Sequence, residues 1–169
     1  MDKSSDKGHR GSASQFFVAG ELCRRELVAV VTLGNCPNTD ILCSNKQGTR
    51  FVHIQVKTFV PGCRTCSVGR KAEHHYGPNF FWVLGGIPKA QSSDEFTYYV
   101  IPSSIMAREV KKAHLIWLAT PGKRGQPHQD NTMRTVSLPP SKSLSGWSIK
   151  RYENAWHLIE RRLRTAGDG

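Results

Sequence analysis

Two apolar runs on either side of the turn NKQG (residues 45–48) constrain the fold more than any other stretch of the chain. The first run, DILCS, covers residues 40–44, and the second, RFVHIQVKTF, covers residues 50–59. Apolar, β-branched runs that are joined by a turn containing Asn and Gly are typical of antiparallel hairpins. The sequence therefore predicts two adjacent strands whose side chains alternate between the faces of a sheet.

The second strand of this hairpin combines an apolar face with a polar one. It alternates between two sets of residues, namely Val52, Ile54 and Val56, and His53, Gln55 and Lys57. The apolar set is expected to face the core, so the polar set shares the opposite face. Asp40 begins the partner strand and falls opposite residues 54–57 if the hairpin closes near residues 46–48. We therefore expect Asp40, Gln55 and Lys57 to converge.

A carboxylate, an amide oxygen and a lysine at one point suit metal-dependent hydrolysis of a phosphodiester bond. Mg²⁺ or Mn²⁺ takes oxygen ligands, which Asp40 and Gln55 offer. Such a metal polarises the phosphoryl oxygen and lowers the pKa of a bound water. Lys57 beside it would orient or deprotonate that water and offset the charge that builds on the phosphate.

The pattern of Asp40, Gln55 and Lys57 on a hairpin that follows a helix resembles the core of the PD-(D/E)xK nuclease superfamily. IQVKT at residues 54–58 resembles the QxK variant of some intron-encoded homing endonucleases. The later runs FFWVLGGI and YYVIPSS also match small bacterial proteins with an IQVK strand. The resemblance implies an α/β, restriction-endonuclease-like core with a mixed central sheet and flanking helices. It also implies a Mg²⁺-dependent endonuclease that hydrolyses DNA.

The resemblance assigns roles to single residues. Asp40 matches the superfamily's metal-binding aspartate, Gln55 matches its second acidic position, and Lys57 matches its lysine. The family often adds a glutamate from the first helix, for which Glu21 and Gln15 are the candidates. The chain departs from the pattern because an amide stands at position 55 and because PNTD displaces the proline before the aspartate. A catalytically inactive nucleic-acid-binding module on the same fold is therefore the alternative function.

Outside the hairpin, the sequence predicts one domain. Residues 1–13 are rich in Ser, Gly and charge and are expected to be a flexible tail, so residues 14–169 form the single nuclease-like domain. LVAVVTL (27–33) is typical of a buried strand. Helices are predicted from residue 14, over 103–113 and over 150–164, and two long loops cover 60–78 and 119–146.

A formal net charge of +11 favours a polyanionic partner, with nucleic acid first and an acidic membrane surface second. No apolar run reaches the roughly 18–20 residues of a membrane span, and the N-terminus lacks the apolar segment of a secretory signal. We therefore expect a cytoplasmic DNA-binding protein, for which a homodimer would be the symmetric way to cut both strands. The expected phosphate contacts come from the two long loops and are Arg64, Arg70, Lys71, Lys123, Arg124 and Arg134.

The five cysteines predict reduced thiols, since their number is odd and a cytoplasmic location is expected. Cys63 and Cys66 nevertheless form a C-x2-C pair, which would bind zinc if two more ligands joined it. The candidates for these ligands are His74, His75, Cys36 and Cys43. A zinc-containing, partner-binding protein is thus a third hypothesis for the function.

Overall fold

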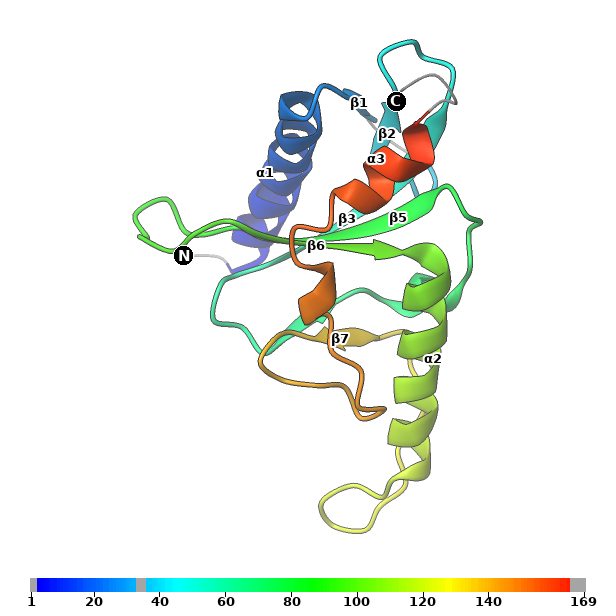
Figure 1. Ribbon diagram of the computed structural model, residues 1–169. Coiled ribbons are helices and arrows are strands. Elements are labelled where there is room, and N and C mark those ends of the chain that lie inside the picture. The colour runs from blue at the N-terminus through cyan, green and yellow to red at the C-terminus, as the bar shows by residue number, and fades with distance from the viewer. Residues whose placement is uncertain (1–2, 33–35, 165–169) are drawn as a thin grey trace.

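The computed structural model describes residues 3–32 and 36–164, with the backbone alone for residues 3–7. Its centre is a five-stranded sheet in the order β1-β2-β3-β5-β6 (Figure 1). These strands are β1 (Val28–Val31), β2 (Ile41–Ser44), β3 (Phe51–Phe59), β5 (Phe80–Gly86) and β6 (Thr97–Pro102). All neighbours are antiparallel except β3 and β5, which are parallel. The predicted mixed central sheet with flanking helices is confirmed.

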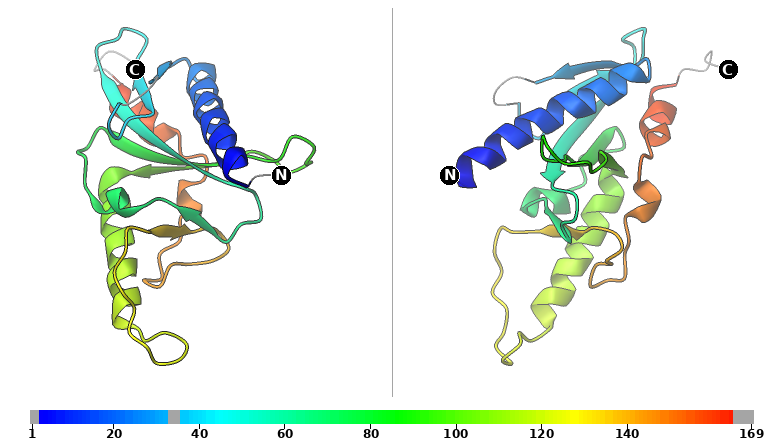
Figure 2. Two further views of the ribbon diagram at one scale, coloured as in Figure 1. Left: turned by 180° about the vertical axis from the view of Figure 1, so that it is seen from behind. Right: turned by 90° about the vertical axis from the view of Figure 1, so that its left-hand side faces the viewer.

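Helices and a small second sheet cover the central strands on both faces (Figure 2). The helical elements are α1 (Lys3–Arg24), η1 (Arg70–Glu73), α2 (Ser103–Ala119), η2 (Lys150–Tyr152) and α3 (His157–Leu163). α1 and α3 pack on the face of β3 and β5 that presents Ile54 and Val83. α2, with the two-stranded sheet of β4 (Thr65–Ser67) and β7 (Thr135–Ser137), covers the face that presents Trp82 and Leu84.

The covering of the second face stops before β1, which is an edge strand. Val28 and Val30 are 46% and 57% exposed, whereas Ala29 and Val31 pack under α1. The prediction of a buried strand over 27–33 was therefore wrong for one face, and Leu33 lies outside the described residues. A β-branched run indicates a strand but does not say how many of its faces another layer covers. Beside β1 and β2, the sheet is thus open on one side.

α1 begins at Lys3, well before the expected start at residue 14. Residues 3–13 continue this helix in place of a separate tail, and residues 1–2 lie outside the described part. Among the side chains of α1 that are described, from Gly8 onward, the buried ones, such as Val18 and Leu22, all come from its second half. Hydrophobic periodicity therefore could not reveal the polar first half. No helix in the described ranges has the length and apolar character that crossing a bilayer requires.

The single helix expected over 150–164 is instead divided into η2 and α3. Asn154 has a left-handed φ of 48° between them, and its N–H donates to the Tyr98 carbonyl on β6 at 2.7 Å. Glu153 also pairs with Tyr99. The helix is thus interrupted where the backbone hydrogen-bonds to the edge strand β6. Helix propensity depends on nearby residues and cannot predict this long-range contact.

Gly85 and Gly86 allow close packing against β5. A Cβ atom at Gly85 would lie 2.7 Å from the Ser14 Oγ of α1, and one at Gly86 would lie 2.7 Å from the Phe59 ring. Both distances are far below van der Waals contact. The two glycines in LGG therefore allow α1 and the Phe59 ring to pack directly against the backbone of β5.

Candidate active site

The carboxylate of Asp40 lies against β3, immediately before β2 begins. The Asp40 N–H donates to the Ile54 carbonyl at 2.9 Å, which extends the hairpin ladder by one residue. Its Oδ2 accepts the Val56 N–H at 2.7 Å and a hydrogen bond from the side-chain amide of Gln55. The Thr32 hydroxyl donates to the Asp40 carbonyl at 3.2 Å and fixes the backbone here. The structure therefore brings Asp40 and Gln55 together, as the hairpin pattern predicted.

Gln55 and Lys57 lie on the face of β3 opposite Ile54 and Val56. Their register partners on β5 are Trp82 and Leu84, which belong to the core under α2. Both polar side chains are only half-buried, because the covering of this face ends beside β3. The predicted alternation of faces is confirmed, and the pair stands at the border between the covered and the open half of the sheet.

Lys57 is half-buried and makes no ion pair within the described part of the chain. In particular, its Nζ is not within 4.0 Å of the Asp40 carboxylate. Its charge acts on the thiol of Cys66 in β4, where burial raises the pKa to about 12 and Lys57 opposes that rise. An unpaired ammonium group at the border of the open face remains available for an anionic ligand.

The oxygen atoms of Asp40 and Gln55 suit a metal ion whose remaining ligands come from water and a substrate. Because a carboxylate only accepts hydrogen bonds, Gln55 must donate its NH₂ group, which leaves its Oε1 free. Asp40 likewise keeps Oδ1 free of hydrogen bonds from the described residues. Those residues contain no group of three or more His, Cys, Asp and Glu side chains that would hold a metal alone. Mg²⁺ commonly uses one or two carboxylates together with water and phosphate, so these residues fit it.

Glu21 and Gln15, the candidates on the first helix, do not join this pair. Glu21 forms ion pairs with Arg24 at 2.9 Å and Arg25 at 3.7 Å, and Arg25 also reaches Glu160 of α3 at 3.6 Å. This group lies on the face that α1 and α3 cover, opposite Gln55. Gln15 is half-buried on α1 and has no hydrogen-bond partner among the described residues.

Thr39 and His53 extend the site along the strands. The Thr39 Oγ1 lies 3.2 Å from the His53 Nδ1, and Thr32 Oγ1 donates to the Thr39 carbonyl at 2.5 Å. Alternation placed His53 on the same face as Gln55, but its contact with the residue before Asp40 required the fold. This contact places an exposed imidazole next to the Asp40–Gln55 pair.

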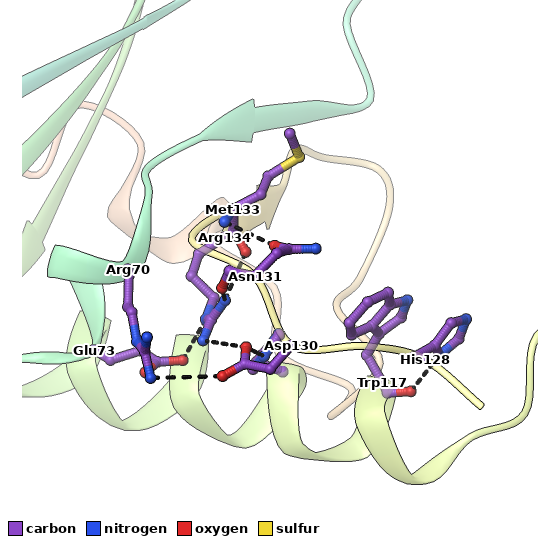
Figure 3. A network of polar contacts seen from close by, with 9 residues as sticks. Arg70, Glu73, Trp117, His128, Asp130, Asn131, Met133 and Arg134 are labelled. Carbon is purple, nitrogen blue, oxygen red and sulfur yellow. Dashed lines mark hydrogen bonds and ion pairs between the residues drawn. The ribbon is translucent and has the colours of Figure 1, made fainter.

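Arg134 is a buried structural residue, so its predicted role as a phosphate contact is wrong. Its side chain is 2% exposed, and its Nε donates to the Glu73 carboxylate of η1 (Figure 3). Its other nitrogens donate to the carbonyls of Asn131 at 2.6 Å and Met133 at 2.8 Å and to Asp130 at 3.2 Å. The guanidinium thus joins the segment before β7 to η1 and has no surface to offer a phosphate.

The other predicted phosphate contacts are exposed. Arg70 is 59% exposed and pairs with Asp130 at 3.5 Å, so it belongs to the edge of the Arg134 network (Figure 3). Arg64 and Lys71 make no ion pair within the described ranges. Lys123 and Arg124 are exposed in the segment after α2, which extends away from the five-stranded sheet in all views (Figures 1 and 2).

The cysteines do not form a zinc site among the described residues, which have no metal-holding cluster. Cys66 is buried in β4, and its raised pKa keeps the thiol protonated, whereas Cys63 is exposed. Among the described residues, the structure therefore does not bring Cys63 and Cys66 together with further zinc ligands.

The fold is similar to that of a known nuclease. It matches the structure of the bacterial homing endonuclease I-Ssp6803I with a TM-score of 0.50 and 13% sequence identity, over 90% of this chain and 91% of that chain. No protein-family model and no curated protein sequence matches the chain. At so low an identity the likeness shows the fold, which is consistent with a nuclease-like architecture, and the chemistry must be argued from the site.

Proposed function

We propose that this protein is a Mg²⁺- or Mn²⁺-dependent DNA endonuclease of the PD-(D/E)xK type in its QxK form. The observation that carries the proposal is the contact of Asp40 with Gln55 and Val56, with Lys57 two residues further along the same strand. The similarity of the whole fold to a homing endonuclease supports it. The net charge of +11 suits a DNA substrate.

In this proposal, the residues of the chain have distinct tasks. Asp40 Oδ1 and Gln55 Oε1 hold the metal, which when bound polarises the phosphate and lowers the pKa of a water. The Val56 N–H and the Gln55 NH₂ group keep the Asp40 carboxylate in one orientation. The Lys57 Nζ hydrogen-bonds the attacking water or the phosphate and offsets the charge that develops there.

A catalytically silent nucleic-acid-binding module is the second candidate function. The observation in its favour is that Gln55 already satisfies Asp40 Oδ2 and brings no second carboxylate. Such a module would retain DNA in a salt-dependent manner without any need for a divalent metal. DNA cleavage separates the two candidates, because only the endonuclease predicts it.

Asp40→Asn is expected to lower the rate of plasmid nicking in Mg²⁺ by at least about 100-fold. The asparagine oxygen in the place of Oδ2 can still accept both the Val56 N–H and the Gln55 NH₂ group, so folding is preserved. The measurement is conversion of supercoiled to nicked plasmid, with EDTA as the metal-free reference. Asp94→Asn, in an exposed loop, is the matched control and should nick at the wild-type rate. Equal nicking by both variants and the wild type would contradict the site.

Gln55→Glu tests metal binding without relying on activity. The substitution places a second carboxylate against Asp40, so like charges should lower the melting temperature in EDTA. A metal neutralises both groups, and Mg²⁺ at ten times its Kd should restore about 1.4 kcal/mol. Thermal melting with and without Mg²⁺ measures both effects. Gln47→Glu makes the same chemical change in the exposed hairpin turn and should respond to neither condition. A Gln55→Glu variant that ignores Mg²⁺ would remove the metal from the proposal.

A further inference from the structure

Two adjoining cavities lie at the end of the sheet where β3 and β5 begin. The first has a volume of about 470 Å³ and is bordered by Arg50, His53 and Arg162. The second has a volume of about 490 Å³ and is bordered by His75, Arg161 and, again, Arg162. Because Arg162 borders both, we treat them together as the basic groove, which connects α3 with the β2–β3 hairpin and with the start of α2.

The basic groove carries positive charge that no acidic side chain among its described lining residues neutralises. Within residues 3–32 and 36–164, no Asp or Glu borders either cavity. Arg50, Arg161 and Arg162 are exposed and make no ion pair within the described residues. The N-terminal end of α2, where Ser103 and Ser104 border the groove, adds partial positive charge, and the first turn of α2 contains no acidic residue.

His53 connects the basic groove with the Asp40–Gln55 pair. His53 borders the groove and contacts Thr39, the residue before Asp40. His53 and Gln55 share one face of β3, so their Cα atoms are about 7 Å apart along the strand. Successive phosphates of one DNA strand rise by about 3.4 Å along the duplex axis. A backbone lying in the groove would therefore reach the pair within a few nucleotides.

We propose that the basic groove binds the phosphate backbone of duplex DNA and leads it to the Asp40–Gln55 pair. This inference deepens the proposed function and rests on it for the choice of DNA as the ligand. The guanidinium groups suit phosphate because they present paired donors in one plane. The groove also assigns DNA contacts to α3 and to Arg50, which lie outside the two loops that the sequence indicated.

The double variant Arg161→Gln/Arg162→Gln tests the groove by binding alone. Anisotropy of a fluorescein-labelled duplex DNA is measured in EDTA over a series of NaCl concentrations, so that no cleavage interferes. Loss of two phosphate contacts should weaken binding about 10-fold or more near physiological salt and reduce the slope of log K against log salt by about 2. Arg50→Gln, a single change on the other side of the groove, should reduce the slope by about 1.

Lys111→Gln/Lys112→Gln on the exposed side of α2 is the matched control, since it removes the same charge elsewhere. If it weakens binding as much as the groove variant, net charge alone accounts for affinity and the groove is overturned. Wild-type binding by the groove variants overturns it as well. Wild-type protein that binds through the groove but never nicks plasmid would overturn only the endonuclease. Nicking that Asp40→Asn abolishes and the groove variants preserve, with unchanged binding, would overturn only the groove.

Discussion

Lys57→Ala is expected to reduce Mg²⁺-dependent nicking by about 10²–10³-fold while the protein stays folded. The half-buried ammonium group makes no ion pair in the described structure, so its removal leaves no charged partner unsatisfied. DNA affinity should fall by no more than the loss of one phosphate contact. Rates from single-turnover nicking and affinities from anisotropy in EDTA measure the two effects separately.

Two further variants identify what Lys57 contributes. Lys57→Arg keeps the positive charge but cannot accept a proton, so partial activity would indicate charge stabilisation and complete loss would indicate proton transfer. Lys89→Ala removes an exposed lysine from the loop after β5 and should nick normally. Wild-type nicking by Lys57→Ala would show that the cleavage does not use the proposed site.

Arg134→Ala is expected to lower the free energy of unfolding by about 3–5 kcal/mol. The substitution removes a 2%-exposed guanidinium and leaves the half-buried Glu73 carboxylate and two backbone carbonyls without their donor. It also weakens the hold on Asp130, whose pKa is kept below its ordinary value by the His114 hydrogen bond and by the charge of Arg134. A loss of this size corresponds to a melting temperature lower by about 10 °C.

Arg124→Ala is the control for Arg134, because its side chain is exposed and its removal should change stability by less than about 0.5 kcal/mol. Below its melting transition, the Arg134→Ala variant should bind DNA as the wild type does. Unchanged melting combined with weakened DNA binding would instead restore Arg134 as a phosphate contact and contradict its structural role.

The hairpin shows which structural features a local sequence pattern can predict. Alternation along β3 has a period of two residues, so the faces of Ile54 and Gln55 follow from the backbone geometry alone. The turn NKQG sets the register to within a residue or so, which is enough to place Asp40 opposite Gln55. The same reasoning could not place Glu21, since the rotation of α1 over the sheet depends on which side chains pack beneath it.

For charged and β-branched residues, burial or exposure was harder to predict from the sequence. Arg134 sits in a polar, loop-like stretch that resembles any basic loop, and only the approach of η1 shows that Glu73 and two carbonyls enclose it. β1 reads as a core strand, yet it lies at the edge because the second layer ends before it. In both cases a residue is buried or exposed according to elements that are distant in the sequence.

The sequence by itself determined the β2–β3 hairpin, the two faces of β3 and the pairing of Asp40 with Gln55, because these depend on neighbours within one hairpin. The mixed sheet was expected only from the family resemblance, because it requires the parallel pairing of β3 with the distant β5. Only the tertiary structure decided that Arg134 is interior, that Glu21 lies across the sheet from the pair, and that Arg50, Arg161 and Arg162 meet in one groove. These positions arise where α1, η1 and α3 pack against the sheet. Packing between segments that are distant in the chain does not produce a periodic pattern in the sequence, so it could not be predicted from it.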